Sequence, residues 1–304
     1  MGAFGTVIRG DFRKLAALMC GACTVLVLVC GSGALAAGVA QPPPVNIVPT
    51  AGIIEMPRSA APMGDSTTLF TKRQFVTGDG LHKHTQTYYW LGPQSTTAGA
   101  KFPLVVVLHD ARGKAYAAEV LASQAMREKF PAYVLVPQSP DGRDWAMPES
   151  YSDTPAYRYE PQRESLPGVI TMLSKVPDQD SIDKNRIYVV GCGDGGAGVY
   201  GAILRFPSVF AGGVAINAKW SVDDAADLTD VPLLIEHGAA DDIVPAAIGR
   251  LMSDQIGKNG GSVSYQEFPG LGHGCASPDF YSREMWDALF KQEKAADADA
   301  DGGQ

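Results

Sequence analysis

Short apolar runs alternate with amphipathic stretches along most of this chain of 304 residues. The run 103–109 is continuously apolar, which is typical of a strand buried on both faces of a parallel sheet. Further strands are predicted at 69–76, 84–91, 133–136, 186–190, 213–216, 231–236 and 263–268. Helices are predicted at about 115–130, 162–175, 195–205, 246–258 and 282–291.

This alternation of strands and helices predicts the fold class. It indicates an α/β fold with a mostly parallel central sheet and helices on both faces. The first two strands flank Gly78-Asp79-Gly80, which is typical of a hairpin turn, so we expect an antiparallel hairpin at one edge of the sheet.

Both ends of the chain differ from this pattern. Basic residues at 9, 13 and 14 precede an apolar run at 15–29 and small residues through 40, as in a secretory signal. We expect a signal peptide at 1–36, a Pro/Ala-rich linker at 37–66, one domain at 67–293 and a disordered acidic tail at 294–304. The apolar run is short for a membrane span, so we expect a secreted or periplasmic protein with no stable span after cleavage; an uncleaved anchor is the alternative.

Composition narrows the range of partners. The net charge is −8 and the pI is about 5.1, which argues against nucleic acid, because phosphate binding needs clustered lysine and arginine. Three of the five cysteines lie in the predicted signal, which leaves Cys192 and Cys275 in the mature chain.

Candidate chemistry follows three of the predicted strands, where sites form in open α/β sheets. The strand at 186–190 runs into GCGDGG at 191–196 and then at once into a helix, which is the geometry of a nucleophile elbow, G-x-S-x-G. Asp241 follows the strand at 231–236, and His273 lies in a glycine-rich loop after the strand at 263–268. The order nucleophile position, acid, histidine is that of α/β-hydrolases.

At these residues the chain resembles secreted α/β-hydrolases of the phospholipase/carboxylesterase and polyhydroxybutyrate-depolymerase-like kind. The matching segments are LVVVLH (104–109), DKNRIYVVG (183–191), RFPSVFAGGVAI (205–216), HGAADDIVP (237–245) and GLGH (270–273). The resemblance implies ester or acyl-transfer chemistry on small or lipidic substrates. It implies Asp241 as the residue that orients the imidazole and His273 as the general base.

Two departures from the family pattern argue against that chemistry. The nucleophile position is Gly193, so His273 has no hydroxyl group to deprotonate, and glycine relieves the backbone strain usual at an elbow. The oxyanion loop HDARG at 109–113 replaces His-Gly-x-Gly, which leaves Asp110, Ala111 and Asp194 as the candidate donors.

Several residues keep alternative interpretations. Cys192 is a buried core cysteine, a substitute nucleophile or a disulfide partner of Cys275. The loop acids and His273 form a cation site or are separate solvated groups, and we expect no metal and no cofactor. The residues with these open interpretations are Asp110, Asp194, Asp241, Asp242 and His273 for the cation site, and Trp145, Tyr151 and Tyr157 as pocket lining or packing. His109 and His237 are expected to be structural.

The favoured hypothesis is a catalytically impaired esterase scaffold that binds a small-molecule or lipidic ester-like ligand. The first alternative is an active hydrolase that uses Cys192, or a water activated by His273 and Asp241. The second is a structural or interaction module of the cell envelope.

Overall fold

The computed structural model describes residues 54–55, 69–77, 84–139, 144–147, 164–176 and 181–294. All of them belong to one unit, Pro44–Gln304. The predicted signal peptide, the loop with Tyr151 and Tyr157, the hairpin turn and the tail beyond 294 lie outside these residues. Within the expected linker, Ile54–Glu55 form a short strand that pairs with the next strand, so this part of the predicted linker has regular structure.

The strands form one sheet of nine, in the order β1-β2-β3-β5-β4-β6-β7-β8-β9. They are β1 Ile54–Glu55, β2 Thr71–Thr77, β3 His84–Leu91, β4 Phe102–Leu108, β5 Tyr133–Pro137, β6 Ile182–Cys192, β7 Gly212–Ile216, β8 Leu233–Gly238 and β9 Val263–Phe268. The pairs from β5 through β9 are parallel, and β1, β2 and β3 are antiparallel to their neighbours. This confirms the predicted parallel sheet with an antiparallel hairpin at one edge.

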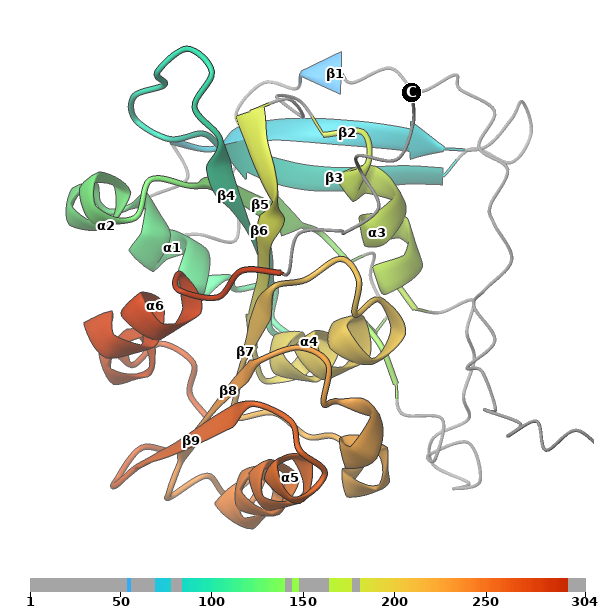
Figure 1. The fold of residues 1–304 in the computed structure, drawn as a ribbon, viewed down its shortest axis with the longest axis vertical. Coiled ribbons are helices and arrows are strands. Elements are labelled where there is room, and N and C mark those ends of the chain that lie inside the picture. Colours follow the sequence, from blue (N-terminus) through green and yellow to red (C-terminus); the bar gives the residue numbers. More distant parts are fainter. Residues whose placement is uncertain are drawn as a thin grey trace, which may run out of the picture. The chain divides into compact units, whose positions relative to one another are not determined.

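Helices cover both faces of the sheet (Figure 1). They are α1 Tyr116–Ala122, α2 Gln124–Lys129, α3 Leu166–Leu173, α4 Asp194–Arg205, α5 Ala246–Lys258 and α6 Arg283–Leu289, with the short helices η5 Val222–Asp227 and η6 Pro278–Tyr281. Leu104, Val106 and Leu108 of β4 pack in one core cluster with residues of α3, α4 and α5. Val105 and Val107 point to the other face, in the cluster with residues of α1 and α6. Because both faces are buried, β4 needs no polar residue, which explains its unbroken apolar run.

Two of the differences between the predicted and the observed elements have a clear local cause. The single helix expected at 115–130 is two helices, because the backbone at Ser123 is extended, with φ −63° and ψ 148°. Strand β6 begins at Ile182 and not at 186, since Ile182 pairs with Phe102 across an irregularity in the register. The polar residues 183–185 hide this extension from an apolar pattern.

The parallel strands bring the candidate residues to one edge of the sheet. Strands β6, β8 and β9 run in the same direction, so the loops after Cys192, Gly238 and Phe268 leave the sheet at their common carboxyl end. No helix among the residues that the structure describes is long and apolar enough to cross a membrane.

Candidate active site

Gly193 forms the turn between β6 and α4. Its backbone has φ 59° and ψ −120°, a conformation that residues with a side chain seldom adopt. Its N–H donates to the carbonyl oxygen of Ile216 at 2.9 Å, and its carbonyl oxygen accepts from Ala197 N–H at 3.0 Å. These bonds hold the turn against β7 and the first turn of α4.

The neighbouring glycines allow a close approach of the strand and the helix, as the motif predicts. A Cβ atom on Gly195 would lie 2.2 Å from the carbonyl oxygen of Leu108, and one on Gly191 would lie 2.2 Å from the Gly195 backbone. Neither distance is possible for a real side chain, so both positions require glycine. The geometry of the elbow therefore agrees with the spacing of the GCGDGG motif.

The loop after β8 fixes the carboxylate of Asp241. Its Oδ1 atom accepts from the backbone N–H groups of Ile243 at 2.9 Å and Val244 at 2.8 Å. The side chain is inaccessible to solvent. With Oδ1 engaged by its own loop, Oδ2 is directed to an outside partner.

That partner is His273. Its Nδ1 lies 2.8 Å from Asp241 Oδ2, while the imidazole is 25% exposed. The opposite nitrogen, Nε2, lies 3.5 Å from the position that a Cβ atom on Gly193 would occupy. The structure thus brings the three predicted positions, Gly193, Asp241 and His273, together.

The loop after β4 has one free candidate donor. Asp110 N–H donates to the Lys114 carbonyl oxygen at 2.9 Å, so it is not available to an oxyanion. The Asp110 carboxylate accepts from the N–H groups of Arg112 and Lys114 and fixes the loop. No hydrogen bond is recorded within the described part of the chain for the N–H groups of Ala111 and Asp194, which leaves these two as candidate donors.

Several carboxylates lie near these candidate donors. The pKa of Asp194 is raised. The largest cause is partial burial of its carboxylate, although the residue as a whole is exposed, and the next are the carboxylates of Asp144 and Asp110. His273 and His109 act in the opposite direction. A carboxylate at this position opposes the build-up of negative charge on a bound carbonyl oxygen, which an oxyanion hole must stabilise.

His109 and His237 are buried parts of the scaffold, as expected. His109 Nδ1 lies 2.8 Å from the Asp110 carbonyl oxygen, and its Nε2 accepts from Ser139 N–H at 3.0 Å, which defines a neutral ring. Burial lowers the pKa of His109 in agreement with that tautomer. His237 is fully buried, with Nε2 2.8 Å from the Val244 carbonyl oxygen and 3.4 Å from Asp241 Oδ2. Trp145 is also buried, and donates to the His109 carbonyl oxygen.

Cys192 is not a free nucleophile, which corrects one of the hypotheses above. It forms a disulfide with Cys275, and the two Cα atoms are 5.9 Å apart. Both residues are buried. Cys192 immediately precedes Gly193 in the chain and Cys275 follows His273 by two residues, so the bridge joins the elbow to the histidine loop. A disulfide sulfur has no thiolate to offer, so Cys192 has no nucleophilic function in this state.

Asn217 is a site residue that the sequence analysis missed. It follows β7, is fully buried, and has φ 47°, the only positive φ of a non-glycine residue within the described ranges. Its Oδ1 accepts from Gly238 N–H at 2.8 Å, and its Nδ2 donates to the Gly272 carbonyl oxygen at 3.2 Å. One amide therefore ties the strand that leads to Asp241 to the residue before His273. Asparagine at a strand end is a weak signal, because it marks turns as often as sites.

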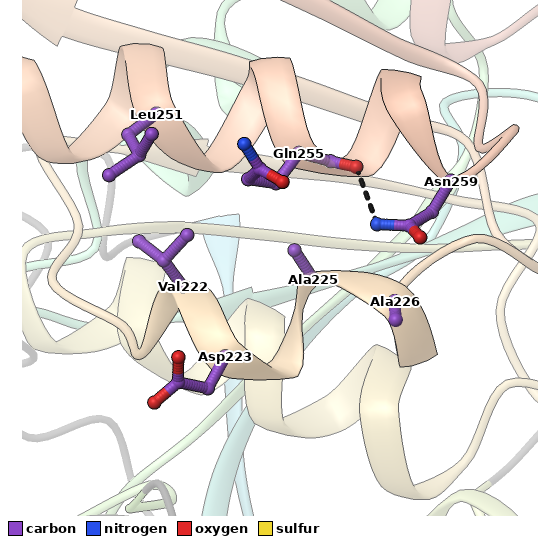
Figure 2. A pocket seen from close by; sticks show the side chains of 7 residues that line it. All are labelled: Val222, Asp223, Ala225, Ala226, Leu251, Gln255 and Asn259. Atoms are coloured by element: carbon purple, nitrogen blue, oxygen red, sulfur yellow. Dashed lines mark hydrogen bonds between the residues drawn. The ribbon is translucent and has the colours of Figure 1, made fainter. Parts of the chain in front are cut away.

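The cation-site alternative receives no support from the described residues. They contain no group of three or more His, Cys, Asp or Glu side chains that could hold a metal ion. A surface groove lies elsewhere, between η5 and α5 (Figure 2). It is lined by Val222, Asp223, Ala225, Ala226, Leu251, Gln255 and Asn259. None of the predicted site residues lines it, so the groove is separate from the candidate site.

Together, the sheet order and the helices on both faces define an α/β-hydrolase fold. Solved structures agree. A thermostable esterase has a TM-score of 0.62 and 26% identity, over 75% of this chain and 64% of that one. Esterase PE8 has a TM-score of 0.52 and 20% identity, over 66% of this chain and 97% of that one.

Sequence comparisons point to the same family. A probable carboxylesterase of Oryza sativa subsp. japonica is 31% identical over 114 residues, 35% of this chain. A probable SOBER1-like carboxylesterase of Arabidopsis thaliana is 25% identical over 111 residues, 34% of this chain. The matches span 42% of the length of each of these curated relatives. No family model matches the sequence. These relatives and the esterase structures support an α/β-hydrolase of the esterase family.

Proposed function

We propose that this chain binds a small or lipidic ester-like ligand on an esterase scaffold and forms no acyl-enzyme. The observation that carries the proposal is the glycine at position 193, directly opposite His273 Nε2. An acyl-enzyme needs a side-chain oxygen or thiolate, and Gly193 has neither. The disulfide removes the neighbouring sulfur from consideration.

The magnitude of the loss favours binding over turnover. Removal of a triad nucleophile typically lowers the rate by about 10⁶. The negative charge of Asp194 beside a candidate oxyanion donor adds to that loss. The N–H of Ala111 remains as a donor that can orient a carbonyl compound, and the Asp241–His273 pair remains as an acceptor at Nε2.

Ester hydrolysis by designed variants tests the proposal. With p-nitrophenyl acetate and p-nitrophenyl butyrate, we expect no turnover of the native protein above buffer, and turnover with a burst in Gly193→Ser. His273→Ala in the Gly193→Ser background is the matched control and should abolish the gain. A burst of p-nitrophenol from the native protein would contradict the proposal. Binding is measured separately, by calorimetric titration of the native protein with propyl butyrate.

A second candidate function is direct hydrolysis by water. The observation that favours it is the retained hydrogen bond between Asp241 and His273, with Nε2 directed at the side-chain position of residue 193. In this reaction Nε2 takes a proton from water, the hydroxide oxygen attacks the ester carbonyl carbon, and the proton passes to the departing alkoxide. It predicts slow turnover of the native protein without a burst, and complete loss in His273→Ala.

We also propose that the protein is exported, as a secreted or periplasmic protein. The basic and apolar pattern of residues 9–29 supports this, and a buried disulfide persists in an oxidising compartment. Mass spectrometry of the mature protein tests it. The expected N-terminus lies just after residue 36, and an intact residue 1 would contradict cleavage.

A further inference from the structure

Gly193 leaves space beside His273 at the position where a side-chain Cβ atom would stand. We call this space the notch. Within 4 Å of the ideal Cβ position of Gly193, the contacts recorded for the described chain are His273 Nε2 at 3.5 Å and Cys275 Sγ at 4.0 Å. The notch is therefore bordered by one polar group, the imidazole of His273, and by one weakly polar group, the disulfide. Its floor is the Gly193 backbone, whose N–H and carbonyl oxygen are both engaged elsewhere.

The imidazole nitrogen that faces the notch, His273 Nε2, can accept a hydrogen bond. Asp241 Oδ2 lies 2.8 Å from His273 Nδ1, and a carboxylate accepts, so Nδ1 carries the hydrogen. In the neutral ring this leaves Nε2 as a lone-pair acceptor. Among the residues that the structure describes, the imidazole of His273 has one hydrogen-bond partner, Asp241 at Nδ1, and no donor lies at Nε2. A serine would supply this donor, and Gly193 does not.

We infer that the ligand carries a free hydroxyl group, which enters the notch beside Gly193 and donates its hydrogen to His273 Nε2. This inference rests on the proposed ligand-binding function and adds the chemical class of the ligand, a hydroxy ester. A carbon atom at the ideal Cβ position meets these described groups at ordinary van der Waals distances, so the carbon of a primary alcohol can stand there.

Other polar groups fit the notch less well. A carbonyl, ether or carboxylate oxygen would face the Nε2 lone pair and gain no hydrogen bond. A hydroxyl group has one hydrogen and matches the one acceptor.

Paired ligands that differ only by a hydroxyl group in place of a methyl group test the inference. The first pair is 2-hydroxyethyl butyrate and propyl butyrate, with the hydroxyl on the alcohol side. The second pair is ethyl glycolate and ethyl propionate, with the hydroxyl on the acyl side. In calorimetric titrations of the native protein at pH 8, we expect the hydroxy ester of at least one pair to bind about fivefold tighter, as one hydrogen bond of about 1 kcal/mol requires.

Three variants locate the effect. Gly193→Ala fills the notch with a methyl group 3.5 Å from Nε2, and His273→Ala removes the acceptor but keeps the space. Both should bind the two members of each pair with equal affinity. Gly257→Ala on the last turn of α5 is the control, because a Cβ there meets only Val263 at 3.8 Å, and it should keep the fivefold preference.

The outcomes separate the two proposals. If the native protein binds both members of both pairs equally, the hydroxyl inference is overturned while the ester-binding proposal stands. If none of the four esters binds, the ester-binding proposal itself fails. A preference that survives in both Gly193→Ala and His273→Ala would move the hydroxyl contact away from the notch and would also overturn the inference. If Gly193→Ala fails to fold, His273→Ala alone decides, because it leaves the turn at Gly193 untouched.

Discussion

Replacement of Asn217 by alanine should loosen the histidine loop and destabilise the protein. The Asn217 amide accepts from Gly238 N–H and donates to the Gly272 carbonyl oxygen, and it is fully buried. Gly272 precedes His273, and Gly238 ends the strand before Asp241. The substitution therefore acts on both halves of the Asp241–His273 pair without contact with either side chain.

The magnitude follows from the two bonds and the backbone. Each lost hydrogen bond lowers the free energy of unfolding by about 1 kcal/mol, and an unpaired buried N–H at Gly238 adds about 1–3 kcal/mol. We expect a total loss of about 3–5 kcal/mol for Asn217→Ala. Asn217→Gly loses the same bonds, but the φ of 47° favours glycine over alanine by about 1 kcal/mol. The glycine variant should therefore be the more stable of the two.

Urea denaturation measures stability, and NMR measures the effect on the site. The proton on His273 Nδ1, hydrogen-bonded to Asp241, should give a resolved downfield signal in the native protein and lose it in Asn217→Ala, at a temperature where both proteins are folded. Asn259→Ala is the control, because Asn259 is exposed and its side chain donates to the Gln255 carbonyl oxygen at the end of α5, away from the candidate site. An Asn217→Ala protein within about 0.5 kcal/mol of the native one, or one that keeps the His273 signal, would refute the reasoning.

Three further predictions concern the scaffold. Double replacement of Cys192 and Cys275 by alanine should lower the free energy of unfolding in urea by up to about 4.5 kcal/mol, because the bridge spans 83 residues. Burial raises the pKa of Glu236 to about 8 from 4.5, so the folded protein keeps a proton that the unfolded chain releases. The free energy of unfolding should then fall between pH 4.5 and 8 by up to about 1.4 kcal/mol per pH unit, and Glu236→Gln should flatten that decline; an equal slope in both proteins would contradict it. Gly195→Ala should destabilise or unfold the protein because its Cβ would meet Leu108 backbone at 2.2 Å, whereas Gly257→Ala should stabilise it by about 0.5–1 kcal/mol; thermal melting compares the two.

The sequence predicts most of the sheet because a strand buried on both faces has an apolar signature. Strand β9 and helix α5 match their predicted bounds, and β4 differs by one residue at each end. Strand β6 begins four residues before its predicted start, at Ile182, which pairs with Phe102, and the polar residues 183–185 lie at an irregularity in the register. The break at Ser123 also has no apolar signature, since the residues on both sides of it form helices and the sequence pattern is that of one continuous helix.

The candidate site is predictable only in part. Its residues follow strand ends in a fixed order, and parallel strands place such residues at one edge. The contacts that hold them are long-range and leave no pattern in the chain. Asn217 contacts Gly272 across 55 residues, and the Cys192–Cys275 bridge joins residues 83 positions apart, whose Cα atoms lie 5.9 Å from each other in the fold. The spacing of apolar residues indicates which face of a helix or strand is buried, and it carries no information on which distant residues form a pair.

Backbone strain is distributed unequally around this site. At position 193 a glycine occupies a φ of 59°, so the strain that an elbow serine would carry is absent together with its hydroxyl group. At position 217 a buried asparagine keeps a φ of 47°, although glycine would relieve it. What the strained residue secures is the loop of His273, which the disulfide also holds from the other side, at Cys275. Strained residues persist where the surrounding structure requires their contacts, so the position of the imidazole is what this scaffold maintains. A ligand hydroxyl group in the notch requires an imidazole acceptor that is held in place. The Asn217–Gly272 hydrogen bond and the Cys192–Cys275 disulfide both hold it. An imidazole without a binding function would require neither contact.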